Sequence, residues 1–510
     1  ESKSTGAKPM DYALEDFFGS SPKTIMNDKT IAYNYAPLEY SVRNISTYLE
    51  QVLQLEAVAC KDWLTNKVDR CVGGKVAKQQ TAGPLQLPLN NVGVMALDYK
   101  GIEGVATSIG HSPIASLIDP VAGTRTAIAE SLSNIIWAPI KDGLQGISLS
   151  ANWMWACKNE GEDARLYAAV EACSNFAIEL GINIPTGKDS LSMKQKYPND
   201  EVIAPGTVII SAGGNCTDIR KVVEPVLQKD GGSIYYINLS QDEFKLGGSS
   251  FAQTLNAIGN EAPTIKEAKF FKKAFNTIQE LILENQILAG HDIGSGGLIT
   301  TLLEMCFADV NLGAKIDFSV FEEKDIIKYL FAENIGIVFQ AKDNATIEAK
   351  LNANGVSFYK LGNTTTEATL DFGPCKLDIV KYRDIWFKTS FLLDQKQSKN
   401  GMAQERFDNY KNQPLQYAFP THFTGKSPEI DSSKPRPKAA IIREKGSNSE
   451  REMANAMYLA GFDVKDIHMT DLISGRENLE DIQFIGAVGG FSNSDVLGSA
   501  KGWAGAFLYN

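Results

Sequence analysis

The sequence predicts an α+β fold followed by a separate, parallel α/β unit. Between residues 36 and 220, and again between 228 and 388, short apolar runs bounded by Gly, Pro and Asn alternate irregularly with longer stretches of helical periodicity. From residue 437 onward, strand-length apolar runs alternate with helix-length segments, as in a parallel sheet. A polar stretch rich in Gln, Lys, Asn, Ser and Pro predicts a linker over residues 389–436.

The first unit, residues 36–220, is predicted to contain three helices and several short strands. It follows a polar lead-in segment at 1–35. Residues 40–57 and 163–180 have apolar side chains at helical spacing, and 121–137 form a third helix. The predicted strands are 68–76, 92–97, 105–109, 147–149 and 208–211.

The second and third units are predicted from the same signals. Long helices are expected at 265–286 and 298–307, with strands at 233–238, 287–289, 334–340 and 357–360. The third unit has predicted strands at 438–443, 461–467 and 484–490, which is the opening of a flavodoxin-like domain. Because such domains usually have about five strands or more, we expect the chain to be cut short.

Composition argues against several classes of function. The 510 residues carry a formal net charge of -11, whereas nucleic-acid binders usually present a basic face. Seven cysteines without a Cys-x-x-Cys pair and four scattered histidines fit a cytoplasmic protein with reduced thiols and argue against a zinc site. No apolar run approaches the roughly 20 residues of a membrane span. The residues from Glu1 to Gly6 form no signal peptide and lack an initiator Met, so we expect the chain to begin inside a longer protein.

The predicted helix at 121–137 carries a polar pair with a clear chemical meaning. Asp119 and Pro120 form a helix start, and Glu130 and Asn134 lie four residues apart on one helical face. A carboxylate and an amide oxygen presented together suit a hard cation such as Mg²⁺, which prefers oxygen ligands. The alternative for an isolated pair of this kind is a solvated polar patch.

A second polar segment, Gly290-His-Asp-Ile-Gly-Ser-Gly-Gly297, lies between the predicted strand 287–289 and the predicted helix 298–307. A Gly-rich loop at a helix N-terminus predicts a phosphate cradle, because the first N–H groups of the helix face the loop. A turn without a ligand is an equally good interpretation of this pattern by itself.

Further short motifs follow one another along the chain. They include Asp69-Arg70, Gly83-Pro-Leu-Gln-Leu-Pro88, Gly123-Thr-Arg-Thr-Ala-Ile-Ala-Glu-Ser-Leu-Ser-Asn134, Leu149-Ser-Ala-Asn-Trp153, Ile184-Pro-Thr-Gly-Lys-Asp-Ser-Leu-Ser-Met-Lys194, His291-Asp-Ile-Gly-Ser-Gly-Gly-Leu298, Arg443-Glu-Lys-Gly-Ser-Asn-Ser449 and Gly489-Gly-Phe-Ser492. In order and spacing they resemble one family, the large, single-chain formylglycinamidine ribonucleotide (FGAM) synthase of purine biosynthesis, also called FGAR amidotransferase. The resemblance covers essentially all of residues 10–510.

The resemblance implies an architecture and a reaction. In this family two tandem halves similar to AIR synthetase precede a class I glutaminase, and the whole is an ATP-dependent ligase that converts FGAR, ATP and glutamine to FGAM, ADP, phosphate and glutamate. This chain resembles the second half, with AIR-synthetase-like domains at 36–220 and 228–388, plus a truncated glutaminase domain at 437–510. The glutaminase Cys, His and Glu would lie beyond Asn510, since the last cysteine is Cys375, so we expect this chain alone to be inactive.

The resemblance also implies an auxiliary, structural site for ATP or ADP with Mg²⁺. Its metal ligands fall on Asn91, Glu130, Asn134 and Asp292, and its nucleotide contacts fall on Asn90 and Gly294. The family has Asp at the position of Asn91 and Ser at the position of Gly294. Because fewer carboxylates bind Mg²⁺ less well, we expect a weakened site.

Two other functions stay open. One is a non-catalytic, nucleotide-stabilised scaffold that supports a partner half, and this is compatible with the ligase. The other is a kinase of the AIR-synthetase superfamily with another substrate, against which the glutaminase-like segment argues. AIR-synthetase-like halves pair through their N-terminal domains. With the first half missing, we expect either a homodimer through the strand zone at 60–110 or an aggregation-prone monomer.

Overall fold

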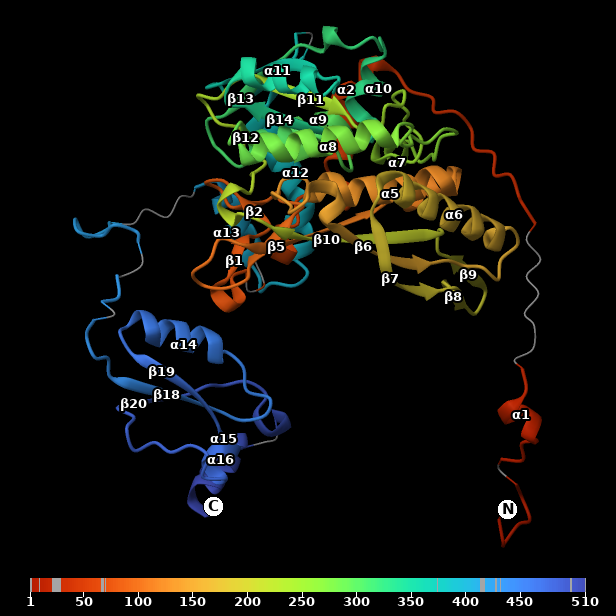
Figure 1. Ribbon diagram of the computed structural model, residues 1–510. Coiled ribbons are helices and arrows are strands. Elements are labelled where there is room, and N and C mark those ends of the chain that lie inside the picture. Colours follow the sequence, from red (N-terminus) through yellow and green to blue (C-terminus); the bar gives the residue numbers. More distant parts are fainter. Residues whose placement is uncertain are drawn as a thin grey trace.

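The computed structural model describes the chain except for residues 1, 9, 21–28, 66, 67, 69, 374, 413–417, 427, 428, 432, 496, 497 and 510. Asp69 of the Asp69-Arg70 motif therefore lies outside the described residues. Two large sheets, with helices between them, make up the bulk of the molecule, and a smaller sheet stands apart near the C-terminus (Figure 1). Among the described helices, none combines the length and apolar character needed to cross a bilayer.

The first sheet is six-stranded and has helices packed against it. Its strands, in spatial order, are β1 (Val76–Lys78), β4 (Gly93–Ala96), β5 (Gly104–His111), β10 (Thr207–Cys216), β6 (Ile147–Met154) and β7 (Asn183–Ser190). Burial alternates along β5 and β10, because one face of the sheet packs against α5 (Pro120–Ile135) and the other does not. β10 runs antiparallel to both of its neighbours, β5 and β6, whereas β6 and β7 are parallel.

The second sheet is seven-stranded and lies deeper in the protein. Its spatial order is β12 (Ile287–Asp292), β14 (Gly336–Ala341), β11 (Ile234–Asn238), β15 (Tyr359–Thr365), β13 (Gly313–Ile316), β16 (Thr369–Asp371) and β17 (Lys376–Asp378). β14 is buried along its whole length, as expected for a strand covered on both faces. Helices α9 (Gly297–Phe307) and α12 (Ile379–Asp394) contribute to the core on one side, and α8 (Ala268–Leu283) contributes on the other.

The two sheets share one apolar core. This core joins α5 and α6 (Glu162–Leu180) of the first unit to α8, β11 and β14 of the second. Phe176 on α6 meets Phe271 on α8 edge to face, with the ring centroids 6.5 Å apart. The shared core fixes the position of one unit relative to the other, so residues from both can form a single site.

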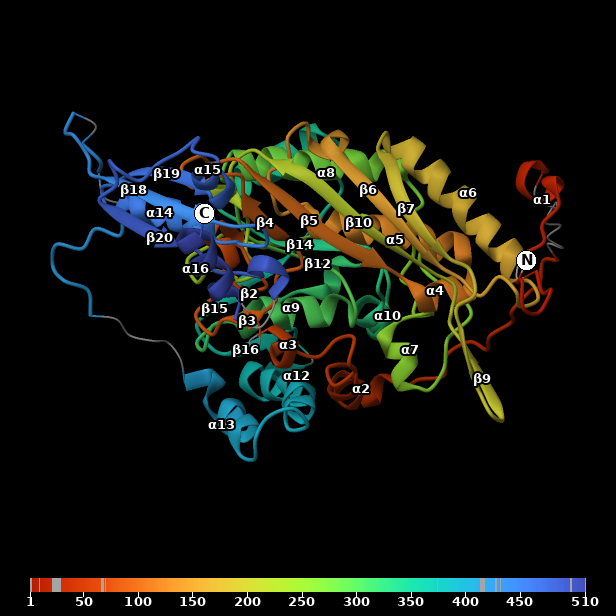
Figure 2. The ribbon, with the colours of Figure 1, turned by 90° about the horizontal axis from the view of Figure 1, so that it is seen from below.

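The third unit is a small parallel sheet of order β19 (Asp463–His468), β18 (Lys438–Arg443) and β20 (Phe484–Ala487), with α14 (Glu450–Leu459) between the first two strands in sequence. Its parallel pairing confirms the predicted α/β unit. Figure 2 shows it beside the edge of the first sheet. There the ammonium group of Lys100 lies 4.1 Å from the ring centroid of Tyr458 on α14.

Most predicted elements are confirmed, and two elements of the first unit need correction. Within the expected strand at 68–76, residues Val72–Gly74 form a 3₁₀ turn, because Gly73 and Gly74 adopt positive φ of 78° and 63° and interrupt an extended chain. The expected helix at 40–57 shrinks to α2 (Ile45–Val52) after a 3₁₀ turn.

The segment at 389–436, predicted to be a linker, is not extended throughout. It begins with the end of α12 and contains α13 (Met402–Asn409). Arg406 on α13 forms a two-pronged ion pair with the buried carboxylate of Asp62, at 2.8 and 3.2 Å. Tyr410 stacks on Phe387, with centroids 4.1 Å apart. These contacts attach the first part of the segment to Asp62 of the first unit and to Phe387 of the second unit.

Candidate functional site

Helix α5 holds its polar pair against the first sheet. As predicted, the helix begins at Asp119, whose carboxylate accepts hydrogen bonds from the backbone N–H groups of Val121 and Ala122. Gly110 on β5 lets the strand approach closely, since a Cβ there would lie 2.3 Å from the carbonyl oxygen of Ala127. This approach brings the backbone N–H of His111 to 2.6 Å from Oε2 of Glu130.

A cavity of about 400 Å³ opens between the two units. Its walls hold five of the six residues predicted from the sequence: Asn91, Glu130, Asn134, Asp292 and Gly294. Asn91 and Asp292 are 201 positions apart in the chain, and the fold places their side chains in direct contact. The cavity also presents seven charged or polar residues that the motifs did not single out as ligands: Glu56, Lys61, His111, His291, Ser295, Thr301 and Glu304.

The sixth predicted residue, Asn90, does not line this cavity. Its side-chain amide donates hydrogen bonds to the carbonyl oxygens of Gln79 and Thr81, at 2.8 and 3.2 Å. Asn90 therefore ties the chain just after β3 (Leu87–Pro88) to the start of β2 (Thr81–Ala82), at the open end of this hairpin. A nucleotide contact by its side chain would cost these two bonds.

The wall formed by Asn91 and Asp292 is satisfied internally. Nδ2 of Asn91 donates to both carboxylate oxygens of Asp292, at 3.1 Å each. An aspartate at position 91 would place two carboxylates at this distance, and their repulsion would be relieved by a cation or a proton. The amide of Asn91 instead donates to both oxygens and adds no second negative charge.

The wall formed by α5 is not satisfied in the same way. Nδ2 of Asn134 donates to the carbonyl oxygen of Ile109 at 2.8 Å, but Oδ1 of Asn134 is buried and has no hydrogen-bond partner among the described residues. A buried acceptor without a partner costs about 1–3 kcal/mol. Since this residue lines the cavity, its oxygen is suited to a ligand that accepts electron density, such as a cation or an N–H donor.

The cavity strongly perturbs its ionisable groups. Burial raises the pKa of Glu130 to about 8, and the negative charges of Asp292 and Glu333 act in the same direction, against the hydrogen bond from His111. Burial lowers the pKa of His291, but Asp292 and Glu304, which contact its two ring nitrogens at 3.3 and 3.0 Å, outweigh burial and raise that pKa to about 10.

Lys61 is a lysine in the cavity wall that the sequence motifs did not identify. Its ammonium group donates to the carbonyl oxygens of Glu56 and Ala59, at 2.5 Å each. Burial lowers the pKa of Lys61, while Glu56 and Glu304 oppose this shift. No motif surrounds it in the sequence, and only the fold brings this lysine to the cavity.

The Gly-rich segment needs a correction. Gly290, His291 and Asp292 belong to strand β12 and not to the loop, which is therefore shorter than predicted. Two N–H groups at the start of α9 already have partners in the protein. The N–H of Gly296 donates to Oε1 of Glu333 at 2.7 Å, and that of Gly297 donates to the carbonyl oxygen of Gly294 at 3.1 Å.

Among the described residues, no group of three or more His, Cys, Asp and Glu side chains is arranged to hold a metal ion. The set predicted from the resemblance draws two of its four ligands from asparagines, so it lies outside this test. The orphaned Oδ1 of Asn134 and the carboxylates of Glu130 and Asp292 fit an oxygen-preferring cation, whereas the amide bridge from Asn91 opposes one.

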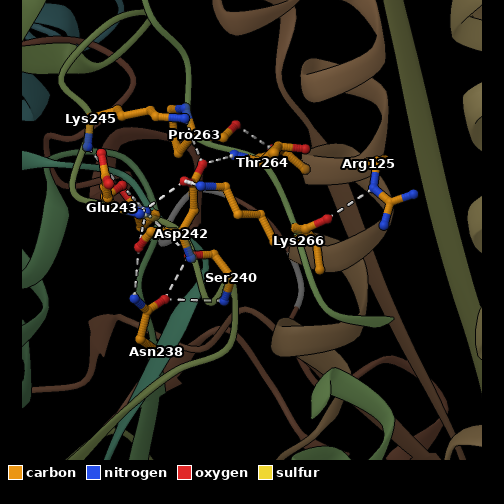
Figure 3. Close-up of polar contacts among 12 residues, drawn as sticks. Arg125, Asn238, Ser240, Asp242, Glu243, Lys245, Pro263, Thr264 and Lys266 are labelled. Carbon is orange, nitrogen blue, oxygen red and sulfur yellow. Dashed lines mark hydrogen bonds and ion pairs between the residues drawn. The ribbon is translucent and has the colours of Figure 1, made fainter. Parts of the chain in front are cut away.

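A polar network at the boundary of the two units supports the α5 wall (Figure 3). The buried carboxylate of Asp242 forms ion pairs with Lys266 and Lys245, at 2.6 and 2.9 Å. From α5, Nε of Arg125 donates to the carbonyl oxygen of Ile265 at 3.0 Å, and Thr126 donates to that of Pro263 at 3.3 Å. The helix carrying Glu130 is thus tied to the unit that carries Asp292.

Comparison with known proteins defines the class to which this fold and cavity belong. Residues 60–215 match the FGAR-AT PurM_N-like domain, residues 229–372 match the C-terminal domain of AIR synthase related proteins, and residues 436–510 match the CobB/CobQ-like glutamine amidotransferase domain. The chain therefore combines a pair of AIR-synthase-type domains with a glutamine amidotransferase domain.

Close relatives name the family. Phosphoribosylformylglycinamidine synthase of Homo sapiens is 40% identical over 516 residues, which cover 98% of this chain and 38% of the human protein. The probable chloroplastic/mitochondrial enzyme of Arabidopsis thaliana is 38% identical over 522 residues, covering 98% of this chain and 36% of that protein. The chain belongs to the phosphoribosylformylglycinamidine synthase family and spans just over a third of the length of these relatives.

A solved structure supports the fold. The structure described as T. maritima PurL complexed with FGAR superimposes with a TM-score of 0.51 at 15% identity and covers 68% of this chain and 54% of that one. At this identity the likeness extends to the fold and not to the ligand.

Proposed function

We propose that this chain is the nucleotide-holding part of an ATP-dependent carbon–nitrogen ligase that converts FGAR, ATP and glutamine to FGAM, ADP, phosphate and glutamate. Its own contribution is an auxiliary site in which a nucleotide stabilises the two AIR-synthase-type domains. The family relationship supports the reaction, and the cavity supports the site. In the whole protein, absence of FGAM formation from these three substrates would contradict the first part of the proposal.

One observation supports the proposal of an auxiliary nucleotide site. Glu130 and Asn134 from α5 and Asp292 from β12 converge on one cavity, and the buried Oδ1 of Asn134 has no partner within the described protein. The volume of about 400 Å³ lies within the roughly 300–1,000 Å³ typical of small-molecule sites. A ligand that supplies a cation to these oxygens would satisfy the orphan acceptor and neutralise two carboxylates.

Magnesium with ADP or ATP fits this requirement. The oxygens of Glu130, Asn134, Asp292 and Asn91 would hold the ion, whose charge would offset that of the phosphates. Lys61 would add a second positive charge at the cavity wall. Because a ligand that binds only the folded state stabilises it, the nucleotide would act as a structural support whether or not it turns over.

Asn91 offers the sharpest test. In Asn91→Asp, the amide bridge to Asp292 is replaced by a second carboxylate. We expect the affinity for ADP with Mg²⁺ to rise about tenfold, which corresponds to about 1.4 kcal/mol. Without Mg²⁺ the same variant should unfold at a lower temperature than the wild type, because the two carboxylates repel each other.

Isothermal titration and thermal unfolding, each with and without Mg²⁺, measure both effects. Asn91→Ala is the matched control, since it removes the bridge without adding charge and should not gain affinity to the same extent. If neither the wild type nor Asn91→Asp responds to ADP with Mg²⁺, this cavity is not the nucleotide site.

We also propose that the sheet face opposite α5 pairs with another AIR-synthase-type domain, or with a second copy of this chain. Met95 and Ile109 on that face are 43% and 55% exposed. Light scattering that finds a well-behaved monomer would count against pairing with a second copy.

A further inference from the structure

Glu333 holds two glycine-rich loops together behind the cavity. It lies between α10 (Ile326–Phe331) and β14, and its Oε1 accepts two backbone hydrogen bonds. One comes from the N–H of Ser250 at 2.8 Å, and the other comes from the N–H of Gly296 at 2.7 Å. These two donors belong to segments 46 positions apart, so a single carboxylate oxygen joins them.

Both donors lie at helix starts. Gly296 precedes the first residue of α9 and adopts a φ of 94°, and Ser250 is the first residue of the short helix α7 (Ser250–Thr254). The N–H groups at the start of a helix have no partner within it, and the positive end of the α9 dipole favours a negative charge there. Hydrogen bonds from N–H groups to a carboxylate are also stronger than those between neutral groups. Glu333 therefore occupies the place that a phosphate takes in a phosphate-binding loop.

The loop that Glu333 restrains is the one that reaches the cavity. Gly294 and Ser295 line the main cavity and also a smaller chamber of about 210 Å³ beside it, to which Glu333 contributes part of the wall. The turn continues inward, because Gly297 donates to the carbonyl oxygen of Gly294 at 3.1 Å and Thr301 donates to that of Asp292 at 3.0 Å. A shift at Gly296 would therefore propagate to Gly294 and to the end of β12.

The backbone next to Glu333 is itself anchored. The amide of Asn334 donates to Oγ of Ser240 at 3.1 Å and to the carbonyl oxygen of Glu243 at 2.9 Å, and its Oδ1 accepts from the N–H of Lys245 at 3.2 Å. This places Glu333 at the edge of the Asp242 network that also holds α5. The hydrogen bonds of Asn334 thus hold the backbone that carries the Glu333 carboxylate in a fixed position.

We propose that Glu333 is a positioning residue of the nucleotide site, which substitutes for a phosphate at the start of α9 and presets the Gly294–Gly296 loop before a ligand arrives. The predicted effect of Glu333 on nucleotide binding rests on the proposed function. Its predicted effect on the conformation of the loop does not. It assigns the phosphates of the nucleotide to the Lys61 and metal side of the cavity, since the N-terminus of α9 is already occupied.

Hydrogen exchange of the backbone amides, measured on the whole 510-residue chain without nucleotide, tests whether Glu333 holds the Gly294–Gly296 loop in place. In Glu333→Ala we expect exchange to rise about tenfold or more for the amides of Gly296 and Ser250 and their neighbours, and to stay unchanged in β10 and α6. Glu333→Gln keeps an oxygen acceptor of the same reach, so it should restore most of the protection. Glu322→Ala, at an exposed position 11 residues earlier in the chain, is the matched control.

Titration with ADP and Mg²⁺ then tests the site. Glu333→Ala should bind about fivefold to tenfold more weakly than the wild type, with Glu333→Gln close to the wild type. If Glu333→Ala fails to fold, Glu333→Asp replaces it, because the shorter side chain does not reach both donors.

The two measurements separate the possible failures. Unchanged exchange at Gly296 and Ser250 in Glu333→Ala, or increased exchange throughout the chain, would overturn the positioning role. Increased local exchange with unchanged nucleotide affinity would limit Glu333 to a structural role and also overturn the proposal. If the wild type itself binds no ADP with Mg²⁺, the proposed function fails, while the exchange result still decides whether Glu333 presets the loop.

Discussion

The two walls of the cavity differ in how completely the protein satisfies them. On the α5 wall, Glu130 has a raised pKa, and within the part of the chain that the structure describes the Oδ1 of Asn134 has no hydrogen-bond partner. On the opposite wall, Asn91 and Asp292 bind each other through two hydrogen bonds of 3.1 Å. One wall is costly without a ligand, and the other is stable without one.

This difference shows how a single amide would change the proposed cation site without removing it. The carboxylate of Asp292 is not lost but engaged, so a cation would have to displace the amide of Asn91 to reach both of its oxygens. The α5 wall still favours a cation, because the carboxylate of Glu130 and the Oδ1 of Asn134 are both unfavourable there without a ligand. Affinity should therefore depend mainly on α5, and the following predictions test that asymmetry.

Removing the charge on α5 should have the largest effect. In Glu130→Gln, the affinity for ADP with Mg²⁺ should fall about 30-fold, equivalent to about 2 kcal/mol, because a charged ligand of the cation becomes neutral. Isothermal titration measures this change. Glu171→Gln, on an exposed turn of α6, is the control and should bind as the wild type does. Equal loss in both variants would contradict the assigned role of Glu130.

The same substitution should alter the pH dependence of stability without ligand. The folded-state pKa of Glu130, about 8, lies above the unfolded value of about 4.3, so the folded protein keeps a proton that the unfolded chain releases between these pH values. The free energy of unfolding should therefore fall as pH rises through this range, by at most about 1.4 kcal/mol per pH unit. Denaturant titrations at pH 5, 6 and 7 should show a shallower fall in Glu130→Gln, and parallel curves would exclude the raised pKa.

Lys61 should have an intermediate effect. Lys61→Met keeps much of the side-chain length but removes the charge that faces the phosphates, so nucleotide affinity should fall about fivefold, equivalent to about 1 kcal/mol. Lys141→Met, at an exposed position after α5, is the control. The loss should shrink at high salt, and a loss independent of ionic strength would indicate a packing effect instead.

Gly294→Ser should have the smallest effect. A Cβ at this position would meet only Oδ2 of Asp292 within 4 Å, at 3.6 Å, so the hydroxyl has room. We expect affinity to rise by less than about threefold, as for one added neutral hydrogen bond. Gly294→Ala adds the Cβ without the hydroxyl and should show no gain. A gain in both variants would point to backbone stiffening and not to a new contact.

Local signals in the sequence were enough for the elements that carry the site. The Asp119–Pro120 start predicted helix α5 and its N-cap, and the spacing of Glu130 and Asn134 placed both on one helical face. The sequence also indicated the Gly-rich segment before α9, but it did not decide the role of this segment. The pattern allowed a phosphate cradle or a turn, and the N-terminus of α9 is occupied by Glu333, which no local pattern connects to it.

The sequence by itself thus determined the helices, most of the strands and the family, because capping, periodicity and motif order are written in neighbouring residues. Only the tertiary structure decided on which wall of the cavity the polar groups have hydrogen-bond partners. The bridge from Asn91 to Asp292, the orphan oxygen of Asn134 and the approach of Lys61 depend on the docking of two units through a shared core. Such contacts arise from positions far apart in the chain, and their hydrogen-bond balance is set by packing that local sequence patterns do not encode.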